Sequence, residues 1–144
     1  MTWPADHAKL RRVRALMAER GLDALVVRAP DNVLYLTNFW PMKGYDAVVF
    51  PREGEPTLVC LEASAEDAAR TAWTSDVRLF KGYDESDPRP PTARVLALAQ
   101  TIAAEHGTVG LELTLGTQAS DRMVGEPTTF TRDWFDGFGP DAVD

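Results

Sequence analysis

Residues 21–39 decide the fold, and they read Gly21-Leu-Asp-Ala-Leu-Val-Val-Arg-Ala-Pro-Asp-Asn-Val-Leu-Tyr-Leu-Thr-Asn-Phe39. The apolar and partly β-branched run Leu22–Val27 predicts a central strand that is covered on both faces. A Pro-Asp-Asn turn at 30–32 ends this run and begins a short helix, which either the Asp or the Asn can cap. The stretch therefore predicts a strand, a short helix and an aromatic loop in direct succession.

Two further strands follow, Ala47–Phe50 and Thr57–Leu61, and the short turn-rich link between them predicts an antiparallel hairpin. Elsewhere, helical and strand patterns alternate. The predicted helices span 6–20, 62–73, 93–106 and 118–124, with a last helical turn at 134–138, and the predicted strands span 77–80, 109–112 and 128–131. This alternation indicates an α/β fold, a three-layer sandwich with a mixed, mainly parallel sheet flanked by helices.

The bulk composition narrows the class of protein. A chain of 144 residues is the size of one domain, and 44% hydrophobic residues are ordinary for a soluble globular protein. The net charge of −7 disfavours nucleic acid and anionic membranes, which bind clustered positive charge. No apolar run approaches the roughly 18–20 residues that a membrane helix needs. With one cysteine and no signal-like amino terminus, we expect a cytoplasmic protein that binds neither nucleic acid nor membrane.

Residues with reactive side chains are scattered. Cys60 lies in an apolar strand-like run and is read as a small buried hydrophobe. His7 and His106 stand alone, and the acidic stretch 84–87 lacks the glycine and the terminal glutamate of a calcium loop. Glu112 ends a strand, where we expect it to cap backbone amides rather than to catalyse. The residues by themselves predict no catalytic group, no metal site and no cofactor in this chain.

The order of these elements resembles the amino-terminal domain of the creatinase/prolidase/aminopeptidase P family, the pita-bread metallopeptidases and their relatives. The best-matched parts are Gly21–Leu25, the segment from Asn32 to Thr37, the hairpin, and Val109–Glu112. After Tyr-Leu-Thr the family usually has Gly, whereas this chain has Asn38, a residue that tolerates left-handed backbone better than most.

The resemblance implies a domain organisation and a set of partners. Residues 1–138 would form the amino-terminal domain, and 139–144 would begin a linker to a catalytic domain. In the family that domain binds two divalent metal ions, such as Mn or Co. The implied partners are the chain's own catalytic domain, a second subunit in a homodimer or tetramer, and a proline-containing peptide substrate.

The resemblance also implies an interface. In the family, the amino-terminal domain packs towards the active site of a partner subunit, and the loop after Tyr-Leu-Thr often lends it aromatic or basic side chains. Carried onto this sequence, the candidates for substrate gating and for the interface are Phe39, Trp40, Met42 and Lys43. The plainer alternative is that these loop residues pack on their own domain.

The function implied is that of a non-catalytic domain in a metal-dependent Xaa-Pro peptidase, of the dipeptidase or aminopeptidase type, serving oligomerisation and shaping the partner's active site. Alternatives are the same domain of a creatinase-like small-amide hydrolase and an autonomous peptide- or protein-binding module. A further alternative is an unrelated α/β enzyme. We expect the chain alone to be inactive and its parent to be a hydrolase.

Overall fold

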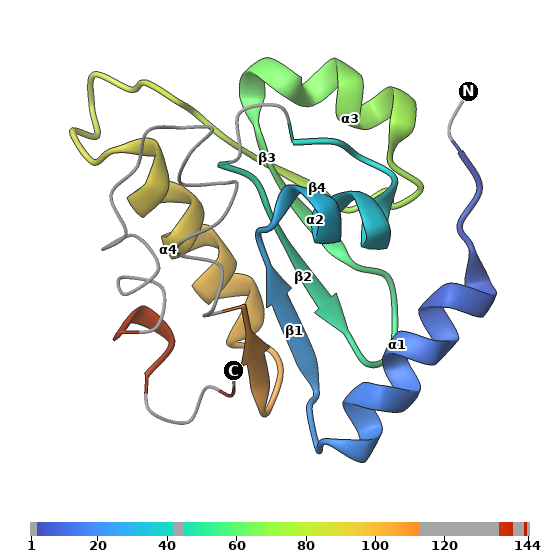
Figure 1. Ribbon diagram of the computed structural model, residues 1–144. Helices are drawn as coiled ribbons and strands as arrows, with labels where there is room; N and C mark the ends of the chain where they lie inside the picture. The colour runs from blue at the N-terminus through green and yellow to red at the C-terminus, as the bar shows by residue number, and fades with distance from the viewer. Residues whose placement is uncertain (1–2, 42–44, 113–135, 140–142, 144) are drawn as a thin grey trace.

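A five-stranded sheet lies between two layers of helices in the computed structural model (Figure 1). The structure describes residues 3–41, 45–112, 136–139 and 143. The helices are α1 (His7–Glu19), α2 (Pro30–Thr37), the 3-10 turn η1 (Glu62–Ser64), α3 (Ala65–Thr71) and α4 (Pro91–Ala103). The strands are β1 (Ala24–Val27), β2 (Ala47–Pro51), β3 (Thr57–Leu61), β4 (Val77–Phe80) and β5 (Val109–Leu111).

The strand order is β4-β3-β2-β1-β5, and the predicted hairpin is confirmed as the antiparallel pair β2–β3. The pair β3–β4 and the pair β1–β5 are parallel, while β1 and β2 run antiparallel. The predicted α/β fold with a mixed sheet is thus confirmed, although its described pairings divide evenly between the two directions. The pair β1–β2 is antiparallel because the link through α2 is short. It begins and ends at the same end of the sheet, where Val27 pairs with Val48.

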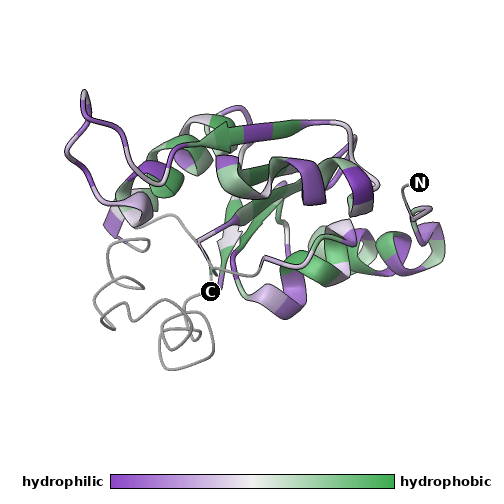
Figure 2. Ribbon diagram, turned by 90° about the horizontal axis from the view of Figure 1, so that it is seen from above, coloured by the Kyte–Doolittle hydropathy of each residue, from purple (hydrophilic) through white to green (hydrophobic). Residues whose placement is uncertain are grey.

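The two faces of the sheet carry separate hydrophobic clusters. Successive side chains of a strand point to opposite faces, so Val48 and Phe50 lie on one side of β2 and Ala47 and Val49 on the other. The helices α1, α2 and α3 cover the first face, and α4 covers the second. Figure 2 shows the hydrophobic strands enclosed between these helical layers. Every residue of β2 and β3 is buried, as is usual for strands that are covered by helices on both faces.

The amino-terminal helix begins as predicted, because Asp6 accepts a hydrogen bond from the Lys9 backbone N–H at 3.0 Å and caps α1. A helical turn at 136–138 agrees with the predicted last turn. The predicted helix at 118–124 and strand at 128–131 lie outside the described residues. Among the helices that the structure describes, none is long and apolar enough to cross a membrane.

One residue of the region assigned to a linker, Val143, lies beside the sheet. Val143 forms a parallel bridge with Gly110, accepting from the Leu111 N–H at 2.7 Å and donating to the Val109 carbonyl at 3.0 Å. Residue 143 therefore lies along the open edge of β5. The boundary between domain and linker at residue 138 stays a prediction.

Candidate interaction surface at the end of helix α2

The carboxyl end of α2 is held by hydrogen bonds to three of its last four carbonyl oxygens. The Leu34 carbonyl accepts from the Asn38 N–H at 2.8 Å. Trp73 donates its indole N–H to Leu36 at 2.7 Å and its backbone N–H to Thr37 at 3.1 Å. Helix ends leave carbonyls without intrahelical partners, so these bonds fix where the helix stops and how the next loop departs.

Asn38 ends the helix in the left-handed conformation that the sequence predicted, with φ of 67°. Its side chain has a further contact that a glycine could not make. The Asn38 Nδ2 atom lies 3.4 Å from the Trp3 carbonyl oxygen and 3.3 Å from that of Pro4. The amino-terminal residues are thereby held against the end of α2.

The two aromatic residues after Asn38 have opposite environments. Phe39 is 1% exposed and belongs to the core cluster under α1, α2 and α3, whereas Trp40 is 45% exposed. The buried Phe39 ring anchors the loop, and Trp40 is presented at the surface. The other two predicted site residues, Met42 and Lys43, lie outside the described residues.

Several large apolar side chains are exposed around this end of α2. We call Trp3, Leu34, Tyr35 and Trp40 the aromatic surface; their exposed fractions are 68%, 40%, 44% and 45%. The Lys9 ammonium lies 4.5 Å from the centroid of the Tyr35 ring, which joins α1 to this surface by a cation–π contact. Exposed aromatic groups of this kind mark binding surfaces more often than scattered single residues do.

The amino end of α2 has no cap from its own segment. Ala29 occupies the N-cap position, and Pro30 begins the helix. Glu112, just after β5, accepts from the backbone N–H groups of Arg28 and Ala29 at 2.6 and 2.9 Å and from the Asn32 side-chain amide. The prediction that Glu112 caps backbone amides is confirmed. The sequence did not reveal which amides these are, because they lie more than 80 residues away.

A buried acidic residue, Asp46, comes directly before β2. Asp46 is 1% exposed, and one carboxylate oxygen accepts from the Leu61 N–H at 2.7 Å while the other has no hydrogen-bond partner. Burial raises the pKa of Asp46 above its ordinary value, outweighing the bond from Leu61. Burial, with the nearby Asp46 carboxyl, also raises the pKa of the Cys60 thiol to about 12. Cys60 is therefore a protonated, inert and buried residue, as predicted.

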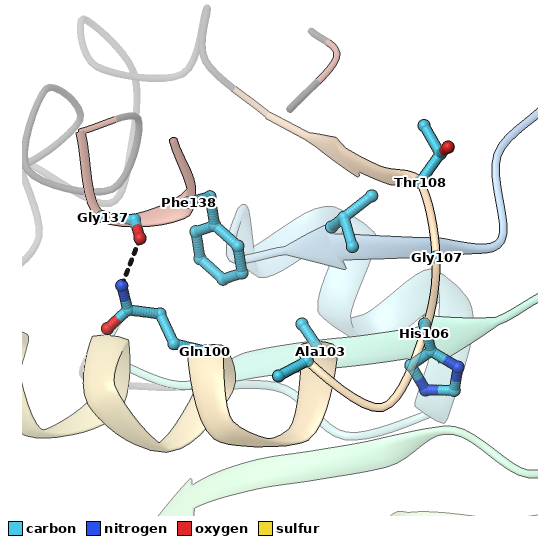
Figure 3. A pocket seen from close by; sticks show the side chains of 9 residues that line it. Gln100, Ala103, His106, Gly107, Thr108, Gly137 and Phe138 are labelled. Atoms are coloured by element: carbon cyan, nitrogen blue, oxygen red, sulfur yellow. Dashed lines mark hydrogen bonds between the residues drawn. The ribbon is translucent and has the colours of Figure 1, made fainter. Parts of the chain in front are cut away.

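Two cavities border the sheet near β5. The larger, of about 700 Å³, lies between the end of α4 and residues 137–138, where the Gln100 side chain donates to the Gly137 carbonyl (Figure 3). Among its described lining residues, His106 is the one titratable side chain. The smaller, of about 270 Å³, lies between α1, α2 and β5 and includes Tyr35 and Glu112 in its wall. Within the described ranges, no three His, Cys, Asp or Glu side chains converge as a metal site requires.

Residues 9–123 match the family described as the Creatinase/Prolidase N-terminal domain. The ectoine hydrolase of Halomonas elongata is 32% identical over 111 residues, which cover 73% of this chain and 28% of that enzyme. The chain thus spans less than a third of that relative's length.

Solved structures with the same fold come from peptidases. The Xaa-Pro dipeptidase of Bacillus anthracis has a TM-score of 0.60 at 16% identity, covering 83% of this chain and 30% of that one. The Creatinase/Prolidase N-terminal domain of an X-Pro dipeptidase from Streptococcus pyogenes has a TM-score of 0.56 at 16% identity, covering 83% and 91%. With the family match across most of its length, the chain belongs to the Creatinase/Prolidase N-terminal domain family.

Proposed function

We propose that this chain is the non-catalytic amino-terminal domain of a metal-dependent hydrolase, and that its aromatic surface completes the active-site entrance of a second subunit. The observation that carries the proposal is the contrast in burial between two consecutive aromatic residues, Phe39 and Trp40. The buried Phe39 ring fixes the loop, and the ring of the next residue, Trp40, is 45% exposed. A rigidly held exposed indole loses little conformational entropy when a partner covers it.

The proposal assigns the catalytic groups to a separate domain. The described residues do not provide a cluster that fits two divalent ions, so no step of the chemistry is assigned to them. The catalytic domain, its Mn or Co ions and the dimeric or tetrameric assembly come from the family resemblance. The short share of the ectoine hydrolase that this chain covers is in keeping with such a division.

For the substrate, we place the parent among the creatinase-like small-amide hydrolases. The support is the 32% identity with the ectoine hydrolase, which is about twice the identity with either solved peptidase. The Xaa-Pro peptidase activity expected from the sequence stays a prediction, because likeness at 16% identity shows the fold alone. Ectoine and a panel of Xaa-Pro dipeptides, offered to the full-length protein with Mn²⁺ or Co²⁺, distinguish the two.

The test of the interface compares two exposed aromatic residues. In the full-length protein, Trp40→Ala should raise KM or lower kcat by roughly thirtyfold, the size of an interface hot spot of about 2 kcal/mol. Lys43→Ala should act in the same direction, and metal content should not change. Tyr83→Ala is the matched control, because Tyr83 is 79% exposed but lies in the link between β4 and α4.

Melting of the isolated chain completes the test. Trp40→Ala should shift its free energy of unfolding by no more than about 0.5 kcal/mol, as is usual for surface positions. Phe39→Ala should cost about 3–5 kcal/mol because it empties a core position. Normal kinetics together with a strongly lowered melting temperature for Trp40→Ala would show that Trp40 is ordinary packing. Turnover of either substrate class by the pure isolated chain would refute the non-catalytic assignment.

A further inference from the structure

The helix that carries the aromatic surface is capped from a distant part of the chain. In the parallel pair β1–β5, Val26 lies opposite Leu111, so Glu112 follows opposite Val27. From there its carboxylate reaches the backbone N–H groups of the next two residues, Arg28 and Ala29. These groups lead directly into the first turn of α2, where a negative charge also interacts favourably with the helix dipole.

The two ends of α2 are therefore fixed by different parts of the sequence. Trp73 and Asn38 hold the carboxyl end, and Glu112 holds the amino end through two backbone amides and the Asn32 side chain. Tyr35 lies between these two anchors. If the Glu112 cap is lost, the amino end of α2 keeps only its apolar packing, through buried Pro30 and Val33, while the carboxyl end keeps its hydrogen bonds as well. The amino end is therefore the part of α2 that we expect to shift.

We propose that Glu112 is a positioning residue for the aromatic surface: by capping α2 from the end of β5, it sets the orientation in which Tyr35 meets a partner. This inference rests on the proposed function for its consequence but not for the cap itself. Glu112 acts only through α2 and contacts neither the partner nor the substrate.

The hydrogen bond from the Asn32 amide to the Glu112 carboxylate can be tested by exchanging the amide and the carboxylate between the two positions. One Glu112 oxygen accepts both backbone N–H groups, while the other accepts from the Asn32 amide. Glu112→Ala removes the acceptor altogether. Asn32→Asp places a second carboxylate against the first, and like charges in contact repel. Adding Glu112→Gln to Asn32→Asp reverses the side-chain bond: the amide nitrogen at 112 donates to the carboxylate at 32, while the amide oxygen at 112 accepts the two backbone N–H groups. Glu53→Gln, at an exposed position in the hairpin turn, is the control.

The first measurement is amide hydrogen exchange in the isolated chain. Glu112→Ala and Asn32→Asp should each speed exchange at Arg28 and Ala29 by roughly tenfold or more, since bonds to charged acceptors are among the stronger ones. The double variant should return the exchange rates towards those of the unchanged chain. If Glu112 only filled space, the double variant would not restore them. Unchanged exchange in folded Glu112→Ala, or no rescue in the double variant, overturns the inference.

The second measurement is steady-state kinetics of the full-length protein. Glu112→Ala should raise KM in the same direction as Tyr35→Ala, and the double variant Glu112→Ala/Tyr35→Ala should be no worse than Tyr35→Ala alone, because both act on one contact. A normal KM for Glu112→Ala beside a raised KM for Tyr35→Ala overturns the positioning role. Normal kinetics for Glu112→Ala, Tyr35→Ala and Trp40→Ala refute the proposed function, while the exchange result still establishes the cap.

Discussion

Asp46 accepts a hydrogen bond from the Leu61 backbone N–H at 2.7 Å while its side chain is 1% exposed. This contact joins the residue just before β2 to the end of β3. The second Asp46 oxygen is buried without a hydrogen-bond partner. A buried carboxylate with one partner is costly when ionised, so the folded state favours the neutral acid.

Replacing Asp46 should change how stability depends on pH. Burial raises the pKa of Asp46 above its ordinary value of 3.8, so its contribution to stability is fully present below about pH 4. That contribution is lost as the pH rises through the higher folded-state pKa. Asp46→Asn does not titrate, so its melting temperature relative to the unchanged chain should increase from pH 4 towards pH 8.

Thermal melts of both chains across this pH range check the prediction. Glu85→Gln removes an exposed carboxylate and serves as the control. A difference between Asp46→Asn and the unchanged chain that stays constant with pH would mean that Asp46 is ionised in the folded state as readily as in the unfolded one.

Substitutions of Asn38 should separate its backbone from its side-chain role. Its φ of 67° is a region that β-branched residues rarely adopt, so Asn38→Val should cost about 1–3 kcal/mol. Asn38→Gly keeps this conformation and should change stability by less than about 1 kcal/mol. It loses the contacts to the Trp3 and Pro4 carbonyls, so acrylamide should quench Trp3 more readily.

The measurement uses a chain in which Trp40 and Trp134 are replaced by Phe and Trp73 is kept, because its indole holds the end of α2. The change in quenching between this chain and its Asn38→Gly variant then reports Trp3. Chemical unfolding gives the stability of each Asn38 variant, and fluorescence quenching reports the exposure of Trp3. Equal stability of the Val and Gly variants would contradict the backbone role. Unchanged quenching in Asn38→Gly would contradict the side-chain role.

Strand and helix positions follow from sequence periodicity, but the direction of one strand pair does not. The buried runs of β2 and β3 and the turn between them predicted the hairpin that the structure has. The alternation of strands and helices favoured a mainly parallel sheet, yet α2 is only 8 residues long and returns the chain to the same end of the sheet, so β1 and β2 pair antiparallel. Periodicity reports which residues are apolar and not where a short helix points the chain.

The site shows a similar division. The sequence located the aromatic loop, but two adjacent aromatic residues carry no signal for which one enters the core, and the structure buries Phe39 and exposes Trp40. The buried Asp46 was missed because a single carboxylate beside a loop has the pattern of a solvated residue. The capping role of Glu112 was visible from its place at a strand end, whereas its partners depend on the β1–β5 register.

A small substitution at Gly110 should affect the Glu112 cap, because Gly110 lies in β5 two residues before Glu112. A Cβ at residue 110 would lie 2.9 Å from Leu25 Cδ2 and 3.0 Å from Leu22 Cδ1, closer than carbon atoms approach without something shifting. Gly110 also pairs with Leu25 in the register of β1 and β5. Added volume here must displace either the two leucine side chains or β5 itself, and β5 leads to Glu112.

Gly110→Ala should therefore lower the free energy of unfolding by about 1–3 kcal/mol, the usual cost of overpacking a filled core. If β5 shifts, the Glu112 cap weakens and hydrogen exchange at Arg28 and Ala29 becomes faster. Leu25→Ala removes the closest clashing atom, so the cycle of Gly110→Ala, Leu25→Ala and the double variant should show a favourable coupling energy of about 0.5 kcal/mol or more. Additive single effects would mean that the clash is relieved elsewhere. Destabilisation with normal exchange at Arg28 would show that the leucines yield while β5 and its cap stay in place.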